Sequence, residues 1–566
     1  MNTKNNTANG LQPFHLADFY KTGHPAMYPA ETTRLVANFT PRSAKHAPVL
    51  PQLFDHKVVW FGLQGFIQEF LIDLFQREFF ALPVEQAVSK YRRRMDTALG
   101  AGAVPVSRLE ALHGLGYLPL EIRSVPEGAR VNMKVPPVIF MNTHPDFPWI
   151  ATYIETLFSC EMWKPATVAT LAFEFRKLLL HFAERTGTDT EFVNWQGHDF
   201  SMRGMSGLHS AMRCGAAHLL SFWGTDTIPA LDYLEDYYGG NADQELLGGS
   251  IPASEHSVMA LRILLTLQQL RVQEAYRDTD EKNLRRIAEC EVIRRFVTQD
   301  YPSGMVSLVS DTFDFWNVIT VIAPALREDI MQRQPDALGN AKVVFRPDSG
   351  DPVRILTGYD ASELESSGGV PVRNADGSYT LKTGQQISDA ERKGAVECLW
   401  ETFGGTMTAK GYRLLDSHVG LIYGDSITLE RARDIMLRLE AKGFASGNVV
   451  FGIGSFVYGM NTRDTFGFAM KAIYAEVGDT AVEIYKDPAT DDGTKKSARG
   501  LIRVEYENDH YVLYEQQSEE QFAGGALEPV FRDGKLLKTQ TIAEIRQRLQ
   551  ASWKADNKLV SGWDCV

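Results

Sequence analysis

Short apolar runs that end in polar or glycine residues recur between about residues 300 and 460. The runs are 305–311, 343–348, 420–425 and 448–452. Each predicts a buried strand with an acid or a glycine at its carboxyl end. Helix-like stretches separate several of them, at 312–330, 388–403 and 429–442. Strands that alternate with helices predict a parallel sheet, either in a barrel or in a doubly wound fold.

Acidic residues stand where the predicted strands end. In a barrel the functional groups gather at the carboxyl ends of the strands, and Asp311, Asp348 and Asp425 fall there. The pattern therefore predicts three acids at one mouth. The alternative for each of them is a structural one, in which the aspartate only caps the following helix.

The two flanks have a different pattern. Residues 1–160 combine turns and short strands, as at 131–141, with helices such as 63–79. Residues 466–550 contain short strand-like runs and then an amphipathic helix from Ile542. Both flanks are typical of an α+β arrangement. The segment 358–388 is rich in Gly, Ser and Asp and predicts a surface excursion.

Composition narrows the function classes. The chain has 566 residues, 58 Lys and Arg against 71 Asp and Glu, and a formal net charge of −13. This balance disfavours a general nucleic-acid-binding surface but allows a local basic pocket. The five cysteines are widely spaced without a C-x-x-C pair, and the N-terminus lacks an apolar signal region. We expect a cytoplasmic protein with no membrane span.

The usual nucleotide and hydrolase signatures do not occur, since the chain has no G-x-x-x-x-G-K-[ST], no strand-linked G-x-G-x-x-G, no H-E-x-x-H and no G-x-S-x-G. The run 346–352 instead places Arg346, Asp348 and Ser349-Gly350 after a predicted strand. An arginine fork suits an oxyanion, and an aspartate suits Mg²⁺ or a sugar hydroxyl. A tight turn is the alternative.

Two more polar clusters precede or follow predicted elements. Residues 198–204 place an imidazole, a carboxylate, an aromatic ring and a guanidinium close together, and Phe200 could stack on a flat heterocycle. In 249–257, Ser254 predicts a helix N-cap, so that His256 lies in the first turn, where the helix dipole favours an added anion. For 198–204 the alternative is a core aromatic residue beside a surface ion pair. For His256 the alternative is a purely structural histidine.

Taken in order, these clusters resemble the type II phosphoribosyltransferases, and among them the members that use nicotinamide. The motifs that carry the resemblance span almost the whole chain: 17–24, 38–42, 198–204, 224–227, 252–257, 309–311, 346–350, 424–425, 451–454, 462–464, 485–488 and 495–497. The resemblance implies an irregular α/β barrel at 165–460. It also implies an α+β domain formed by the segments 1–164 and 461–566.

The resemblance also implies a reaction. Family members join nicotinamide to 5-phosphoribosyl-1-pyrophosphate, giving nicotinamide mononucleotide and pyrophosphate in NAD salvage, with Mg²⁺ as cofactor and with ATP as co-substrate through a phosphohistidine. By resemblance, His256 is the phosphorylated residue and Glu255 supports it. Asp311 and Asp348 hold the metal, and Arg346 joins the catalytic set.

The remaining site residues follow from the same resemblance. The predicted substrate-binding set is Tyr20, Phe200, Arg203, Asp226, Ser250, Gly424, Asp425, Gly452 and Gly454. Tyr20 would come from the second subunit of a homodimer with shared active sites, and that subunit would also supply Arg42, Arg463, Lys471, Lys486 and Lys495 for phosphates. The sequence departs from the family in a shorter glycine run at 452–459 and in Ser426, where glycine is commoner.

Two rival functions follow from the same residues. One is a nicotinate or quinolinate phosphoribosyltransferase, whose site should offer an extra cation to a carboxylate, whereas Asp226 offers the opposite charge. The other is a catalytically silent binding protein on the same fold. Loss of His256, Asp311 or Asp348 would favour it, and all are present.

Overall fold

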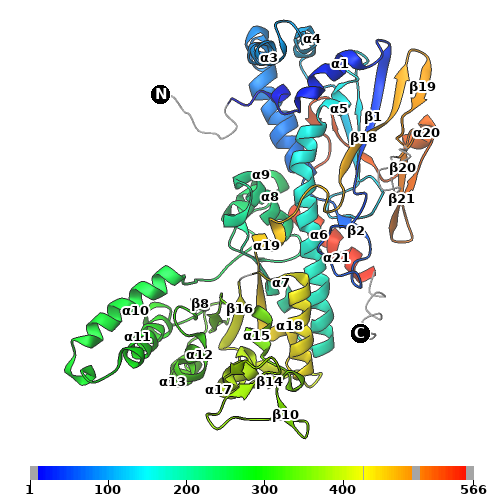
Figure 1. Cartoon of the computed structure of the whole chain (residues 1–566). Coiled ribbons are helices and arrows are strands. Elements are labelled where there is room, and N and C mark those ends of the chain that lie inside the picture. The colour runs from blue at the N-terminus through cyan, green and yellow to red at the C-terminus, as the bar shows by residue number, and fades with distance from the viewer. Residues whose placement is uncertain (1–9, 425, 487–497, 556–566) are drawn as a thin grey trace.

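A long helix joins the two parts of the molecule. The computed structural model describes residues 10–424, 426–486 and 498–555. Helix α6 (Glu155–Thr186) runs from the α+β part, drawn uppermost in Figure 1, down along the α/β part below it. It is buried over most of its length, including Pro165 inside the helix. Side chains along one helix thus serve both parts of the molecule.

The α/β part contains a parallel sheet of six strands. Its order is β7-β6-β17-β16-β9-β8. The strands are β6 (Gly197–Asp199), β7 (Gly224–Thr225), β8 (Val306–Val309), β9 (Val343–Arg346), β16 (Val419–Tyr423) and β17 (Val449–Ile453).

The segment 249–254 links the two edges of this sheet. Gly249 forms a parallel bridge with Gly224 of β7, and Ala253 forms one with Ser307 of β8. Backbone hydrogen bonds accompany both bridges, from Thr225 N to the Gly249 carbonyl (2.9 Å) and from Ser307 N to the Pro252 carbonyl (2.9 Å). The sheet therefore curls into the irregular α/β barrel that the resemblance implies, which confirms the predicted fold class.

The buried strands were the most predictable elements, since β8, β9, β16 and β17 coincide with the four apolar runs. The helices differ more. Helix α18 (Leu429–Ala441) matches its prediction, but the predicted helix 388–403 is two helices, α16 (Asp389–Lys393) and α17 (Ala395–Phe403). Gly394 separates them because its φ of 85° is left-handed. The predicted helix 312–330 begins only after Asp314, whose side chain accepts from Asn317 N.

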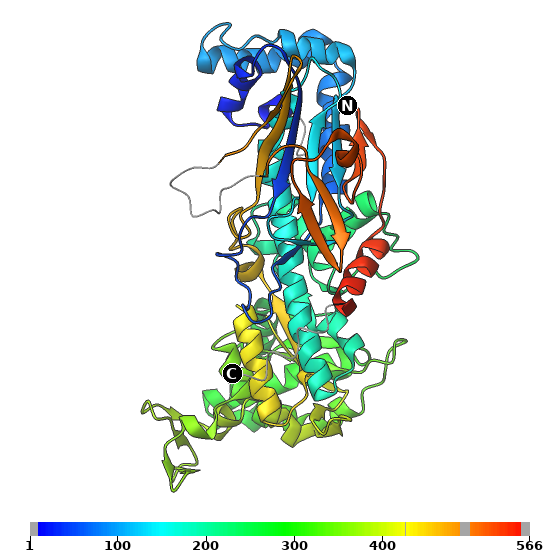
Figure 2. The same cartoon turned by 90° about the vertical axis from the view of Figure 1, so that its right-hand side faces the viewer.

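The α+β part is built from both ends of the chain. Its antiparallel sheet has the order β19-β18-β1-β5-β3-β22-β23. The strands are β1 (Thr32–Thr40), β3 (Leu120–Ser124), β5 (Val138–Asn142), β18 (Ala469–Val477), β19 (Thr480–Glu483), β22 (Glu528–Arg532) and β23 (Lys535–Leu536). Figure 2 shows β1 and β18 running side by side along this part. The predicted strand at 131–141 is divided, because Pro136 and Pro137 lie between β4 (Arg130–Asn132) and β5.

Two apolar clusters form the interior. One contains the barrel strands and the helices around them, and the other contains the α+β sheet. They meet within α6, where Ala166 belongs to the α+β cluster and Val168 to the barrel cluster. The C-terminal helix α21 (Ile542–Ala555) packs Ile545 and Leu549 into the barrel cluster. The division at 164/165 and 460/461 stays a prediction, and the last helix contacts the other part.

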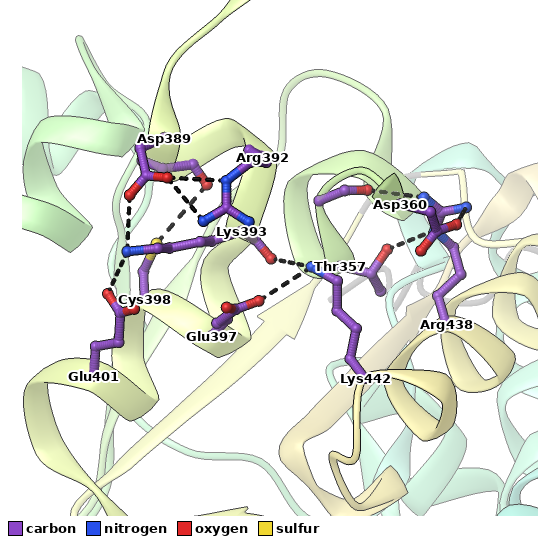
Figure 3. Close-up of polar contacts among 12 residues, drawn as sticks. Thr357, Asp360, Asp389, Arg392, Lys393, Glu397, Cys398, Glu401, Arg438 and Lys442 are labelled. Carbon is purple, nitrogen blue, oxygen red and sulfur yellow. Dashed lines mark hydrogen bonds and ion pairs between the residues drawn. The ribbon is translucent and has the colours of Figure 1, made fainter. Parts of the chain in front are cut away.

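The excursion 358–388 lies at the lower end of the barrel in Figure 1 and is anchored by charged side chains. It carries the short strands β10 (Ser366–Ser367), β11 (Val370–Pro371), β12 (Tyr379–Thr380) and β13 (Gln386–Ile387). Figure 3 shows Arg438 of α18 reaching Asp360 (2.7 Å) and Lys442 reaching Glu397 of α17 (3.2 Å). The first pair holds the base of the excursion against α18, and the second joins the end of α18 to α17 beside it.

Candidate active site

The ring of Phe200 lies over the carboxyl ends of two barrel strands. It follows β6 directly, and two glycines make room for it. A Cβ added at Gly452 would lie 2.4 Å from the Phe200 ring, and one at Gly424 would lie 3.4 Å from it. The glycine at 452 therefore leaves the space that the Phe200 ring occupies. A cavity of about 470 Å³ opens beside it, lined also by Arg203 and Asp226.

Asp226 is held at the edge of this cavity by two neighbours. Its Oδ1 lies 2.8 Å from His198 Nε2 and accepts a hydrogen bond of 2.6 Å from Ser250 Oγ. Its backbone N donates to the Asp199 carbonyl (3.0 Å), which fixes the main chain. Burial alone would raise the pKa of Asp226, but the hydrogen bonds from His198 and Ser250 hold it below its ordinary value.

Arg346 is the last residue of strand β9 and lies at the same mouth of the barrel. Its guanidinium donates to the Ser254 carbonyl, and its backbone carbonyl accepts from Ser310 N (3.0 Å). Burial lowers the pKa of Arg346, while the acids at 348, 226 and 311 oppose that change. A guanidinium remains charged even so, and a fixed charged fork of this kind can pair with a carboxylate or a phosphate.

Asp311 organises the loop that carries Asp348. Its Oδ2 accepts hydrogen bonds from Asp348 N (2.9 Å), Ser349 N (2.8 Å) and Ser349 Oγ (2.7 Å). Burial would raise the pKa of Asp311, but these donors and His256 hold it below its ordinary value. Asp311 and Asp348 therefore do meet at one mouth, as the strand pattern predicts. Asp425, the third predicted acid, lies outside the described residues.

His256 begins helix α10 (His256–Arg271), and its Nε2 lies 3.1 Å from Asp311 Oδ1. Its position in the first turn agrees with the sequence prediction, but the cap does not. Glu255 is the N-cap residue, and Ser254 is buried with its hydroxyl accepting from Val309 N (2.9 Å). The prediction of a Ser254 cap is wrong because the Ser254 hydroxyl is hydrogen-bonded to Val309 N, next to the bridge between segment 249–254 and β8. Glu255 accepts from Ser257 Oγ.

The basic residues predicted for phosphates gather on the α+β part. Arg42 follows β1, and its Nε donates to the Gly467 carbonyl (2.8 Å). Lys471 lies on β18, where burial lowers its pKa and the positive charges of Arg42, Lys486 and Arg463 lower it further. These four cations therefore lie close together. Tyr20, which is 60% exposed, feels the charge of Arg463 as well.

The structure thus contains two separate groups of predicted residues. One group lies at the barrel mouth and consists of Phe200, Arg203, Asp226, Ser250, His256, Asp311, Arg346 and Asp348. The other group lies on the α+β part and consists of Tyr20, Arg42, Arg463, Lys471 and Lys486. Gly454 precedes the short helix α19 (Ser455–Tyr458). Lys495 lies outside the described residues. Ser426 has a φ of 49°, a left-handed conformation that suits the glycine commoner in the family.

Sequence reasoning missed two residues at this site. The sequence presents His198 only as part of a cluster, and it indicates Ser349 only for backbone contacts to phosphate or for a turn, yet the two side chains contact Asp226 and Asp311 directly. The glycine at 224 is the available signal for His198, since a Cβ there would lie 2.6 Å from His198 Nδ1. A glycine before Thr225-Asp226 therefore leaves space for an imidazole on the neighbouring strand.

Comparison with known proteins gives consistent relatives. Residues 195–535 match the nicotinate phosphoribosyltransferase (NAPRTase) family. A nicotinamide phosphoribosyltransferase of Acinetobacter baylyi is 49% identical over 539 residues, covering 95% of this chain and 97% of that protein. The protein of the same name from Xanthomonas campestris is 31% identical, covering 77% of this chain and 80% of that protein.

A solved structure supports the fold. The crystal structure of nicotinate-nucleotide pyrophosphorylase from Pyrococcus furiosus aligns with a TM-score of 0.51 at 13% identity, covering 98% of this chain and 99% of that one. At this identity the likeness concerns the fold alone. It agrees with the curled parallel sheet and the second domain described above.

Proposed function

We propose that this chain, which belongs to the nicotinate phosphoribosyltransferase family, is a nicotinamide phosphoribosyltransferase. It would make nicotinamide mononucleotide and pyrophosphate from nicotinamide and 5-phosphoribosyl-1-pyrophosphate in NAD salvage. The observation that carries the proposal is the ionised Asp226 beside the Phe200 ring at the cavity. A carboxylate there accepts from an amide NH₂, whereas it repels the carboxylate of nicotinate.

The residues at the mouth suit this pentosyl transfer. The pyridine nitrogen is the nucleophile, so the reaction requires no nucleophilic side chain. Departure of pyrophosphate builds positive charge on the ribose and negative charge on the leaving group, which acids and cations at fixed positions stabilise. Asp348 and Arg346 stand where they could serve these charges, and Phe200 orients the ring by stacking.

Mg²⁺ suits one of the two predicted aspartates better than the other. This ion keeps several waters and is usually bound by one or two carboxylates with substrate phosphates. The Oδ2 of Asp311 already accepts three hydrogen bonds from the chain. We therefore assign Asp348 to contact Mg²⁺ bound with the pyrophosphate, and Asp311 to hold the loop of Asp348 in place. When bound, the ion supplies charge stabilisation to the leaving group.

ATP coupling is supported by the pair of His256 and Asp311. A carboxylate only accepts hydrogen bonds, so the Nε2 that faces Asp311 carries a proton, and in the neutral imidazole Nδ1 then keeps its lone pair. His256 is also half exposed, with 51% of its side chain accessible. The imidazole is thus arranged to attack the γ-phosphorus of ATP through Nδ1, releasing ADP and forming a phosphohistidine.

The mutant His256→Ala tests this role. We expect it to lose ATP hydrolysis and the ATP-stimulated part of synthesis, while slow ATP-independent synthesis persists because Asp226, Arg346 and Asp348 are unchanged. ADP release and nicotinamide mononucleotide formation are measured in the same reaction. ATP hydrolysis at the parent rate would contradict the assignment.

A homodimer with shared sites would bring the two groups of residues together. A second copy could place its Tyr20 over Phe200 and its cluster of Arg42, Arg463, Lys471 and Lys486 beside the phosphates. The apolar surface supports this arrangement, since Tyr20 and Phe19 are 60% and 54% exposed and Met460, near Arg463, is 71% exposed. Large exposed apolar side chains are typical of contact surfaces.

We further propose a cytoplasmic location. Cys160, Cys214, Cys290 and Cys398 are all free thiols, as expected in a reducing compartment. In the described ranges no helix is both long and apolar enough to cross a bilayer.

One assay tests the function. Purified protein is given 5-phosphoribosyl-1-pyrophosphate and Mg²⁺ with nicotinamide, nicotinate or quinolinate, each with and without ATP. We expect nicotinamide to have the highest kcat/KM and ATP to stimulate its use. A preference for either acid would favour the rival phosphoribosyltransferases, and inactivity with all three would favour the silent binding protein.

A further inference from the structure

Asp226 is placed by two side chains that come from different parts of the barrel. His198 lies on β6, and Ser250 lies on the segment that bridges β7 and β8. Both contact the same oxygen, Oδ1, at 2.8 Å and 2.6 Å. Two partners on one oxygen fix the rotation of the carboxylate about its Cβ–Cγ bond, which is otherwise a broad torsion. Asp226 also lines the cavity, and Oδ2 is the oxygen that these two donors leave for a ligand there.

His198 itself is held by its surroundings. The residue is only 8% exposed, and its ring lies 4.7 Å from the Phe200 ring. Gly224 leaves the space for the imidazole, since a Cβ there would lie 2.6 Å from Nδ1. The carboxylate of Asp226 is an acceptor, so His198 must donate from Nε2, and Ser250 must donate its hydroxyl hydrogen. The direction of each hydrogen bond is therefore set.

We propose that His198 is a positioning residue that sets the preference for an amide over an acid by holding the Asp226 carboxylate with Oδ2 toward the ring substituent, with Ser250 as its partner. This inference rests on the proposed function. His198 acts through Asp226 and has no contact with the reacting carbon in this role. A carboxylate held in one orientation accepts from the amide without first losing rotational freedom, and it presents fixed negative charge to an acid.

Three substitutions at His198 distinguish the effect of its N–H donor from the effect of its imidazole ring. His198→Gln keeps an N–H donor at about the reach of Nε2, His198→Asn keeps an amide that is too short to reach Asp226, and His198→Leu removes the donor at similar volume. We expect His198→Leu and His198→Asn to raise the KM for nicotinamide about tenfold, with kcat changed much less, because a hydrogen bond to a charged group is lost. His198→Gln should restore most of the parent KM. Ser250→Ala should act in the same direction.

A double-mutant cycle shows whether His198 acts through Asp226. In an Asp226→Asn background, His198→Leu should no longer change the ratio of kcat/KM for nicotinamide to that for nicotinate. Circular dichroism and thermal melting verify that each variant is folded. If His198→Leu does not fold, His198→Asn and Ser250→Ala carry the test.

The possible failures are distinguishable. A parent enzyme that prefers nicotinate would contradict the proposed function. A parent enzyme that prefers nicotinamide, combined with an unchanged KM and ratio in folded His198→Asn and Ser250→Ala, would overturn the positioning role alone. The same loss in His198→Gln as in His198→Leu would also overturn it, because the donor would then be irrelevant.

Discussion

Asp226 combines a net charge with a fixed position at the cavity, and both properties can be changed separately. The hydrogen bonds from His198 and Ser250 keep its pKa below the ordinary value, so it is ionised at neutral pH. The substitution Asp226→Asn keeps the size and removes the charge. The consequences for the two pyridine substrates should therefore be opposite.

We expect Asp226→Asn to lower kcat/KM for nicotinamide by about tenfold or more, since a hydrogen bond to a charged group contributes about 1.5–3 kcal/mol. Use of nicotinate should rise from its low base, because the like-charge contact is removed and Arg346 remains nearby. Steady-state kinetics with both substrates on both proteins measure this. An unchanged ratio would mean that Asp226 only braces its turn.

For single residues, the sequence predicts which side chains belong to the candidate site better than it predicts which side chains contact one another. The acids at 311 and 348 could be expected at one mouth, since the ends of parallel strands meet at one edge. The contact between His198 and Asp226 joins residues 28 positions apart and depends on the space left at Gly224. The Ser254 hydroxyl was assigned to the nearest helix, whereas the structure pairs it with Val309, 55 positions away. Local rules cannot rank such distant partners.

Among the elements, the junction of α16 and α17 shows how closely two backbone segments can pack. A Cβ added at Gly394 would lie 2.4 Å from Gly358 N, and Gly394 itself has a φ of 85°. The predicted single helix fails at this glycine. The apolar face that predicts a helix over 388–403 comes from the second half alone, since α17 buries Ala395, Val396 and Leu399 in the barrel cluster, whereas α16 buries no residue.

We expect Gly394→Ala to reduce the free energy of unfolding by about 2–4 kcal/mol, through left-handed strain and the contact with Gly358 together. Gly384→Ala is the matched control, because Gly384 has a φ of 88° but open space around its Cβ position. It should cost about 1 kcal/mol from strain alone. Urea denaturation of both variants measures the difference, and equal losses would show that the close approach is unimportant.

Glu127 joins several elements and carries a pH dependence. It is fully buried, which raises its pKa from 4.5 to about 7 although Gly62 N, Gln64 N and Tyr238 Oη donate to it. Between these pH values the folded chain keeps a proton that the unfolded chain has lost. Stability therefore falls as the pH rises from about 4.5 to about 7, and it levels off above that.

The substitution Glu127→Gln removes this contribution by making the group neutral at every pH. We expect the variant to lose less stability than the parent between pH 5 and pH 7, with a difference of at most about 3 kcal/mol. Denaturant unfolding at several pH values measures the two slopes. Parallel slopes would mean that Glu127 stays ionised in the folded protein.

At the scale of the whole molecule, the two termini form one sheet and the chain between them forms the barrel. Pairing of β1 with β18 joins Asn38 to Lys471, which alternation along the chain cannot predict. The family resemblance implies only that the two end segments form one α+β domain. The C-terminal helix was expected with the α+β domain but packs into the barrel cluster through Ile545. Its apolar spacing predicts a helix without specifying the surface that it covers.

The barrel mouth and the basic cluster are separate groups of residues in one chain, and complementation between two inactive variants tests whether two copies of the chain combine them in one site. Tyr20→Ala and Asp348→Ala should each inactivate their own homodimer, because every site in it lacks one required residue. In a heterodimer of the two, one site would carry both defects and the other neither.

Refolding the two variants together at equal concentration should therefore restore about one quarter of the parent activity, since half of the dimers are mixed and one of their two sites is intact. Differently tagged chains allow the mixed dimers to be isolated and assayed directly. Tyr20→Ala mixed with the double mutant Tyr20→Ala/Asp348→Ala is the control and should stay inactive, because no site then receives an intact Tyr20. Inactive purified heterodimers of the single mutants would show that each chain completes its own site, with Tyr20 and the cations of the α+β part serving the Phe200 cavity of the same copy.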